Sequence, residues 1–302
     1  MSSETKEKRA RPGILVTVLA TLGALALLST FVFFLFIFLM IRSGGQVQEI
    51  IKKGPKIGVI QISGTITWPE PYLKAIKEFK EDKEVRAVIV RIDSPGGAVG
   101  ASQEIYQDLK LLDQEKPVVA SLCSVAASGG YYAALGARRI IADPGTVTGS
   151  IGVVMQLPNL GPLLKKIGVK TTVVKSGRYK DIGSITREMS DDERQLMQEV
   201  LDDVHMQFIE AVAKSRKLPM EKVTSIADGR VFTGRQALEH GLIDQLGNLS
   251  VAVTEATRLA GIKEKPYLVY PKKDKMTIIK ELLEEGGAKS IARFRSGDLA
   301  IW

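Results

Sequence analysis

Cysteine and histidine are scarce in this sequence. Its 302 residues include one cysteine, Cys123, and two histidines. A single cysteine excludes a disulfide within the chain, so the fold must be stabilised by its hydrophobic core. CxxC and HExxH patterns are absent, which leaves no ordinary set of zinc ligands. We therefore expect neither a metal ion nor another cofactor.

Motifs that bind nucleotide phosphates are missing as well. The sequence contains no Gly-Lys dipeptide, which excludes a P-loop, and no G-x-G-x-x-G pattern. The formal net charge is +8, but the basic residues are spread along the chain rather than gathered among aromatic ones. Nucleic-acid binding is therefore not predicted. A mild preference for an anionic membrane surface fits this charge better.

The two histidines bear directly on a Ser–His–Asp triad. His205 lies in a predicted long helix beside its apolar face. His240 lies at a predicted helix end before Gly241, where a cation suits the helix dipole. Both positions favour a structural role. The S-x-x-K pattern of penicillin-binding proteins occurs only from Ser3 to Lys6, which we attribute to chance. A serine enzyme would therefore need a base other than histidine.

A long apolar run lies near the N-terminus. Residues 14–41 are 28 consecutive uncharged and mainly apolar residues, whereas about 20 cross a bilayer. A cleavable signal peptide is the alternative, but its apolar core usually has about 7–15 residues and precedes a small-residue cleavage site. We expect a transmembrane helix over 14–41. Counted over 15 residues on each side of the run, basic residues are equally frequent, but within ten residues they are more numerous on the N-terminal side, so residues 1–13 are expected in the cytoplasm and the remaining chain outside.

The rest of the chain alternates between strand-like and helix-like segments. Residues 42–56 are expected to be a linker. Strands are predicted at 57–62, 85–92, 117–123, 139–142 and 169–175, and helices at 71–82, 98–114, 126–137, 190–217, 234–240, 249–260 and near 276–285. One face of the longest helix carries the apolar residues Met197, Val200, Leu201, Val204, Phe208 and Val212. Near-continuous apolar strands that alternate with helices indicate an α/β fold with a buried parallel sheet.

Glycine-rich and serine-rich segments follow several of these strands. They are D-S-P-G-G (93–97), A-A-S-G-G-Y-Y (126–132) and G-S-I-G (149–152), with K-S-G-R-Y-K-D (175–181) downstream. Ser128 is expected where a strand turns into a helix, whose first N–H groups are free. The N–H of Gly129 would then face the oxyanion formed when Ser128 attacks a carbonyl, and glycines of the first segment could supply a second donor. Either segment alone is common in ordinary turns.

Together, in this order, the segments resemble the signal peptide peptidase A family in its short, single-repeat form. The resemblance spans residues 57–271, and A-A-S-G-G-Y-Y is its most specific part. The sequence G-R-V-F-T-G (229–234), Ala237 and G-L-I-D (241–244) also match. The resemblance implies a crotonase/Clp-protease-like fold of repeated ββα units, preceded here by the transmembrane helix. Residues 272–302 would form a C-terminal tail.

The resemblance also implies site residues and partners. The nucleophile falls on Ser128, its general base on Lys180 and a serine that orients the lysine amine on Ser150. Gly97, or alternatively Gly96, would supply the second oxyanion N–H beside Gly129. The implied function is a membrane-anchored serine endopeptidase that degrades cleaved signal peptides in or near the cytoplasmic membrane. It would assemble as a homo-oligomer of eight subunits, with serine and lysine supplied by neighbouring subunits.

A lysine base has a physical requirement. Free lysine has a pKa of about 10.4 and is almost fully protonated at pH 7, whereas a base must be neutral. Asp181 would oppose this if it faced the amine of Lys180, so we expect it to point away. Tyr131, Tyr132 and Cys123 are expected to pack in the interior. Two alternatives remain: a crotonase-like acyl-CoA enzyme without a nucleophile, and an inactive membrane scaffold.

Overall fold

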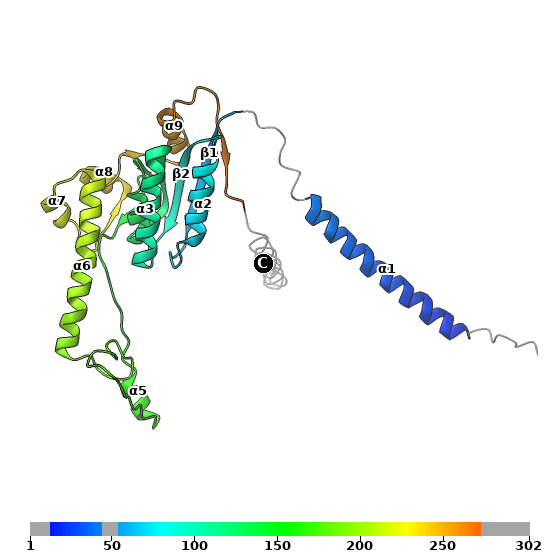
Figure 1. Cartoon of the computed structure of the whole chain (residues 1–302), viewed down its shortest axis with the longest axis horizontal. Coiled ribbons are helices and arrows are strands. Elements are labelled where there is room, and N and C mark those ends of the chain that lie inside the picture. The colour runs from blue at the N-terminus through cyan, green and yellow to red at the C-terminus, as the bar shows by residue number, and fades with distance from the viewer. Residues whose placement is uncertain (1–12, 44–53, 273–302) are drawn as a thin grey trace, which may run out of the picture. The chain divides into compact units, whose positions relative to one another are not determined.

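The computed structural model describes residues 13–43 and 54–272, and the chain divides into two compact units, Met1–Lys53 and Gly54–Trp302 (Figure 1). In the first unit, helix α1 runs over Ile14–Ser43 and so covers the predicted apolar run. Judged on the described residues, no helix is long and apolar enough to cross a membrane. The predicted transmembrane helix is therefore not confirmed. The helix expected near 276–285 lies outside the described residues.

The second unit is built on one mainly parallel sheet, which confirms the predicted α/β class. The order along the sheet is β6-β5-β3-β2-β1-β8, and β4 and β7 extend it beside β3. Among the paired strands of the described region, only β5 and β6 run antiparallel. The strands are β1 (Lys56–Ser63), β2 (Val85–Ser94), β3 (Val118–Ala127), β4 (Arg139–Ala142), β5 (Val147–Gly149), β6 (Val231–Thr233), β7 (Gln245–Leu246) and β8 (Tyr267–Val269).

Both faces of the sheet are buried, which explains the near-continuous apolar strands. Because side chains alternate along a strand, Val59 and Ile89 pack with α9 (Leu249–Leu259) on one face. Ile60 and Val90 belong to the larger cluster on the other face, together with residues of α2 and α3. Figure 1 shows α2 and α3 side by side against the sheet. The strand ends that carry the glycine-rich segments are thus held between two packed layers.

Most predicted helices form within two residues of their expected bounds. The pattern of apolar spacing located them well because each buries at least part of one face. They are α2 (Glu70–Glu81), α3 (Val99–Glu115), α6 (Asp191–Arg216), α8 (Gly234–His240) and α9, and the structure adds two short helices, α5 (Gly161–Lys166) and α7 (Met220–Thr224).

Two predicted elements were wrong. The helix expected at 126–137 begins only at Gly129, as α4 (Gly129–Ala134), because β3 continues to Ala127. Ala126 pairs with a neighbouring strand on each side, with Ser94 on β2 and Thr148 on β5. These pairings override the helical preference of alanine. The strand expected at 169–175 does not form: the whole segment is exposed, and within the described part of the chain it pairs with no strand.

Residues 152–203 extend away from the sheet, and we call them the arm. Figure 1 shows α5 near the outer end of the arm and α6 leading back to the sheet. Ser190 and Glu193 form a capping box that starts α6. Of the apolar face predicted for this helix, only the part from Phe208 onward is buried, and Val200 is 52% exposed. Among the described residues, the arm half of this face is therefore only partly covered, with Met197 and Leu201 half-buried.

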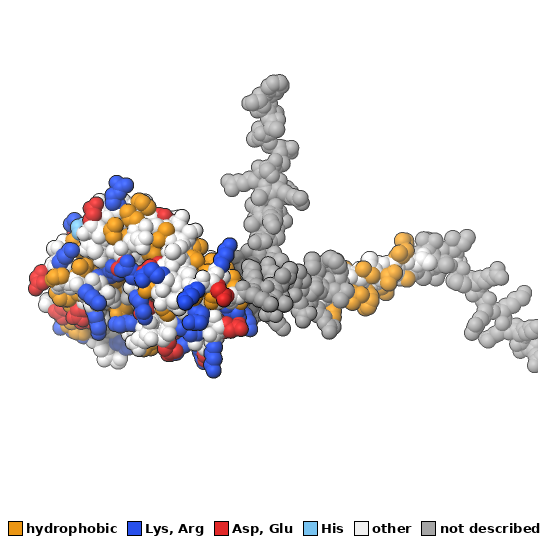
Figure 2. Space-filling model, turned by 90° about the horizontal axis from the view of Figure 1, so that it is seen from above, with side chains coloured by type: hydrophobic (Ala, Val, Ile, Leu, Met, Phe, Trp, Pro, Cys, Tyr) orange, Lys and Arg blue, Asp and Glu red, His pale blue; other side chains and the backbone are white. Residues whose placement is uncertain are grey.

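Charged side chains of both signs are mixed on one face of the second unit (Figure 2). Figure 2 shows one face, on which Lys and Arg side chains lie between acidic and apolar ones rather than in one block.

Candidate active site

Ser128 occupies a strained turn between β3 and α4. Its backbone has φ 51° and ψ −123°, a conformation that residues with a Cβ rarely adopt. Its N–H donates to the carbonyl of Gly149 over 2.8 Å, and its own carbonyl accepts from the N–H of Tyr132 over 2.8 Å. These two bonds hold Ser128 between the end of a strand and the start of a helix. A strained backbone conformation that the surrounding structure holds in place is typical of functional positions, so the conformation of Ser128 points to a functional role.

The segment Gly96–Ala98 lies directly against this turn. Ile66 donates its N–H to the Gly96 carbonyl over 2.9 Å and accepts from the Ala98 N–H over 2.7 Å. In an extended segment the N–H groups alternate in direction, so the N–H of Gly97 faces away from Ile66. The N–H of Gly96 already donates to Ser94 Oγ over 3.1 Å. This geometry favours Gly97 over Gly96 as an available donor.

Glycine is required at both proposed donors. A Cβ on Gly97 would lie 2.0 Å from the carbonyl oxygen of Ile66. A Cβ on Gly129 would lie 2.3 Å from Ser102 Oγ and 3.2 Å from the nitrogen of Gly97. The backbones of Gly97 and Gly129 therefore approach each other beside Ser128. Two adjacent N–H donors at a serine are the arrangement that an oxyanion hole needs.

Ser128, Gly97 and Gly129 line one small cavity. Apolar side chains complete part of its wall, among them Tyr132 and Phe208, whose rings lie 4.7 Å apart. These side chains give the cavity beside the serine a partly apolar wall. Ser128 itself is half-buried, which leaves its hydroxyl accessible from the cavity.

Ser150 lies at the neighbouring strand end. It follows Gly149, which pairs with Ala127 across the parallel strands β5 and β3. Like Ser128, it has φ 51°, and its N–H donates to the carbonyl of Arg230 over 2.9 Å. The structure thus places the two predicted serines next to each other, each directly after the C-terminal end of its strand.

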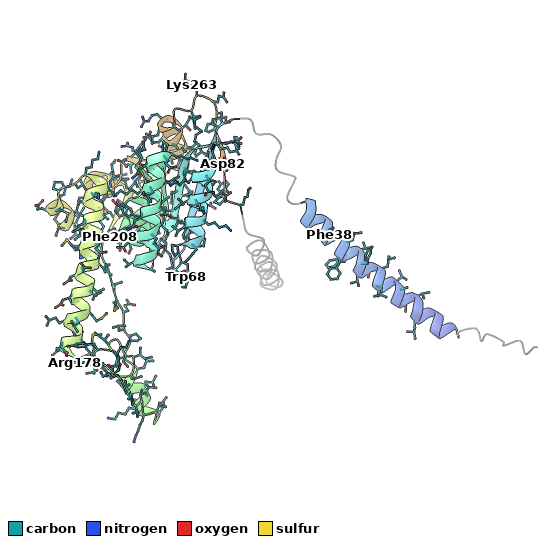
Figure 3. All side chains as sticks on the ribbon, viewed as in Figure 1. Phe38, Trp68, Asp82, Arg178, Phe208 and Lys263 are labelled. Atoms are coloured by element: carbon teal, nitrogen blue, oxygen red, sulfur yellow. The ribbon has the colours of Figure 1, made fainter. Side chains whose placement is uncertain are left out.

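Lys180 lies elsewhere, in a turn of the arm. Its N–H donates to the carbonyl of Gly177 over 3.2 Å, and its side chain is exposed. Arg187 bonds both Asp181 of this turn and Glu193 at the start of α6, whereas Phe208, which lines the Ser128 cavity, follows fifteen residues after Glu193. Fifteen helical residues span about 22 Å. Figure 3 shows Arg178, two residues before Lys180, at the opposite end of α6 from Phe208. Within one chain, Lys180 is therefore remote from the Ser128 cavity.

The carboxylate of Asp181 points toward other cations, as expected. It accepts from Arg187 Nε over 2.9 Å and from Lys175 Nζ. These bonds, that to Arg187 first, hold the pKa of Asp181 well below its usual range.

The remaining residues named in the sequence analysis make packing or hydrogen-bonding contacts. Tyr131 is buried as expected and donates to the Leu242 carbonyl over 2.7 Å, and burial raises its pKa. Tyr132 is also buried, although it lines the cavity. Cys123, which was expected to be buried, is half-buried, and Arg91 Nη2 donates to its Sγ over 3.1 Å. The ring of His240 lies 4.9 Å from that of Phe232.

A comparison with known protein families shows which family the chain belongs to. Residues 110–263, half of the chain, match the model of peptidase family S49. The chain belongs to this family. The match covers Ser128, Ser150 and Lys180, and the family is that of signal peptide peptidase A, as the sequence motifs predicted.

Individual S49 relatives support this assignment. A protein of Synechocystis sp. named "Putative protease" is 49% identical over 209 residues, which are 68% of this chain and 75% of that protein. "Serine protease SPPA, chloroplastic" of Arabidopsis thaliana is 38% identical over 74% of this chain and 32% of its own length. "Protease 4" of Salmonella typhi is 35% identical over 74% of this chain and 36% of its own. The chain thus spans about a third of the latter two.

Sequence reasoning missed several residues of the candidate site. Ser102 is fully buried and packs on Gly129, and a polar residue on the buried face of the helix predicted at 98–114 was the signal that could have revealed it. Ile66 fixes the Gly96–Ala98 segment through a bridge between distant segments, for which the sequence holds no local signal. Phe208 was assigned to a core face, but it also lines the cavity.

Proposed function

We propose that this chain is a serine endopeptidase in which Ser128 is the nucleophile. The observation that carries the proposal is the strained backbone of Ser128 beside the N–H groups of Gly97 and Gly129. A neutral lysine amine would take the proton of Ser128 Oγ as the oxygen attacks the scissile carbonyl. The two N–H groups would stabilise the oxyanion. The lysine would then give its proton to the leaving amine, and water would hydrolyse the acyl-enzyme.

Lys180 is our candidate for the base, and Ser150 for the group that orients its amine. The remoteness of Lys180 within one chain supports delivery of the lysine by a neighbouring copy. The arm is suited to such an assembly because it exposes many apolar side chains, with Val154 78% and Val174 95% exposed. Burial of these residues between copies would provide the hydrophobic driving force. We propose a closed ring of eight copies on a crotonase/Clp-protease-like fold.

Labelling with a fluorophosphonate probe tests the nucleophile directly. We expect one probe per active chain, attached to Ser128, because only an activated serine in an oxyanion hole reacts readily. Peptide mass mapping would identify the labelled residue. The matched control is Ser124, which lies four residues earlier on the exposed side of β3 and should stay unlabelled. Absence of labelling would favour a crotonase-like acyl-CoA enzyme or an inactive scaffold.

We also propose that residues 14–41 anchor the protein in the cytoplasmic membrane, with residues 1–13 in the cytoplasm and the peptidase outside. This rests on the sequence: 28 residues without a charged side chain. Lipid would thus be one partner, and cleaved signal peptides that remain in or near the membrane would be the substrates.

Fractionation and a reporter fusion test the anchor. The full chain should stay with membranes in alkaline carbonate, whereas a chain that lacks residues 1–53 should be released. A periplasm-dependent reporter fused after Trp302 should be active, because long domains after an N-in anchor are translocated. Release of the full chain would refute the anchor, and a reporter active only in the cytoplasm would reverse the orientation.

A further inference from the structure

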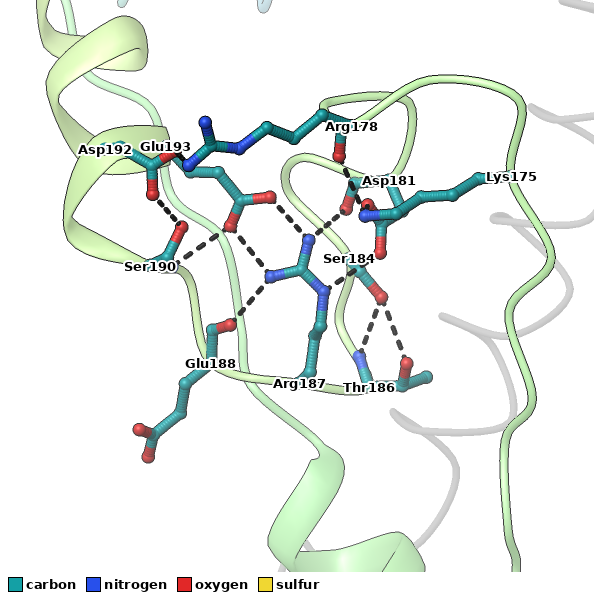
Figure 4. Close-up of polar contacts among 10 residues, drawn as sticks. All are labelled: Lys175, Arg178, Asp181, Ser184, Thr186, Arg187, Glu188, Ser190, Asp192 and Glu193. Carbon is teal, nitrogen blue, oxygen red and sulfur yellow. Dashed lines mark hydrogen bonds and ion pairs between the residues drawn. The ribbon is translucent and has the colours of Figure 1, made fainter.

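A cluster of charged side chains surrounds the turn that carries Lys180. Arg187 lies at its centre, between Asp181 from the turn and Glu193 from the first turn of α6 (Figure 4). On one side, Lys175 bonds both Asp181 and the carbonyl of Arg178. On the other side, Arg178 donates to Asp192 over 2.6 Å. Arg178 and Asp181, which lie on either side of Lys180, are therefore held by hydrogen bonds, whereas the side chain of Lys180 is exposed.

The guanidinium of Arg187 makes a bond with each of its N–H groups. A guanidinium has five N–H donors in a fixed planar arrangement. Nε donates to the Asp181 carboxylate over 2.9 Å. Nη1 donates to the Glu188 carbonyl over 2.9 Å and to Glu193 over 2.8 Å. Nη2 donates to Glu193 over 2.6 Å and to the Asp181 carbonyl over 3.3 Å.

These bonds join three segments at one point. Asp181 is held through both its carboxylate and its backbone, which fixes the residue immediately after Lys180. Glu193 is buried, caps α6 through the N–H of Ser190 over 3.0 Å, and cannot move without disturbing the helix. Through Arg187, the position of the Lys180 turn is thus set by α6, whose far end lines the Ser128 cavity.

The cluster also compensates charge. Asp181 and Glu193 carry two negative charges, and Lys175 and Arg187 carry two positive ones, while Arg178 and Asp192 form a further neutral pair. An uncompensated carboxylate beside Lys180 would favour its ammonium form and oppose its action as a base. The pairing also holds the pKa of Glu193 at about 2, mainly through Arg187. Other charged groups on the cavities around Arg187 are Lys165, Lys170, Glu188 and Arg194.

We propose that Arg187 is a positioning residue for catalysis: it fixes the Lys180 turn on α6 and cancels the negative charge of Asp181 beside the base. The proposal rests on the proposed role of Lys180. It assigns a function to a motif, Arg187-Glu188-Met189-Ser190 followed by Glu193, that otherwise reads only as a helix start.

A charge cycle tests this proposal on the full chain in detergent, with a fluorogenic peptide as substrate. Arg187→Gln leaves a net negative charge near Lys180, so the rise of kcat/KM with pH should move up by about one pH unit. Below both midpoints, this lowers kcat/KM about tenfold at a given pH. Asp181→Asn leaves a net positive charge and should move the midpoint down. The double variant Arg187→Gln with Asp181→Asn is again neutral and should return the midpoint to that of the parent chain.

The conservative variant Arg187→Lys separates position from charge. It keeps the charge but cannot make five bonds, so we expect an unchanged midpoint and a kcat lowered about tenfold, with little change in KM. If the arm needs Arg187 for folding, Asp181→Asn still tests the proposal because it keeps Arg187: a folded Asp181→Asn variant whose midpoint equals that of the parent chain would overturn the proposal. Equal midpoints in all variants would reduce Arg187 to a structural role.

The Lys180→Ala variant tests the proposed base separately from the proposed role of Arg187. If this variant is inactive while the charge cycle leaves the midpoint unmoved, only the role of Arg187 is refuted. If Lys180→Ala stays active, Lys180 is not the base, and the proposed mechanism fails together with the inference drawn from it.

Discussion

Replacing Ser128 with alanine should abolish peptide hydrolysis and leave the fold intact. The change removes the attacking oxygen, and loss of a serine nucleophile costs roughly 10³- to 10⁶-fold in kcat. The side chain of Ser128 makes no hydrogen bond to another described residue, so the substitution breaks no such bond. The measurement is kcat with a fluorogenic peptide, together with the thermal unfolding curve. Residual turnover above a few per cent would point to another nucleophile.

A matched variant, Ser128→Gly, tests the strain at the same position. The φ of 51° is unfavourable for serine and alanine by about 1–3 kcal/mol but not for glycine. Glycine loses more entropy on folding, by about 0.5–1 kcal/mol, so the glycine variant should be more stable than the alanine variant by about 1 kcal/mol. Both should be inactive. Equal or lower stability of the glycine variant in denaturant unfolding would show that the turn stores no strain.

Periodicity located the elements that bury a face within the chain. The strand predicted at 139–142 and the helix at 234–240 have the observed bounds, because β4 and α8 both pack in the core. The segment 169–175 has the same apolar character but buries nothing here. Apolar periodicity shows that one face of a segment tends to be buried, but it does not specify which part of the structure buries that face. The wrong strand and the exposed face of α6 are therefore the same kind of failure, and both fall on the arm.

In the candidate site, too, residues positioned by the neighbouring sequence could be predicted, whereas residues positioned by contacts far apart in the chain could not. Ser128 and Gly129 could be predicted because a strand followed by a glycine-rich helix start determines their backbone. The sequence indicated only that a glycine of 93–97 could supply the second donor, and the choice of Gly97 came from the family resemblance, because its position depends on a bridge to the distant residue Ile66. The network that holds the Lys180 turn joins residues up to eighteen positions apart, from Lys175 to Glu193. Charged residues at such spacings have too many possible partners for sequence alone to select.

Mixing two inactive variants should restore activity if the site lies between subunits. Ser128→Ala chains keep the lysine, and Lys180→Ala chains keep the serine. In a closed ring each site takes its serine from one copy and its lysine from the neighbour. Equal and random mixing therefore leaves about a quarter of the sites with both residues. Against a background at least a thousandfold below the parent activity, recovery to about 25% is a very large effect.

The controls decide what a recovery means. The two variants should be co-assembled from separately tagged chains, and native mass measurement should confirm mixed rings of eight. A double variant with both substitutions, mixed with either single variant, offers no complete site and should stay inactive. Titration of the mixing ratio adds a second constraint, because the recovered activity should follow the product of the two fractions and peak at equal amounts. Mixed rings without recovery would mean that each chain completes its own site, which would require the arm to fold back so that Lys180 crosses the length of α6 that separates it from the Ser128 cavity.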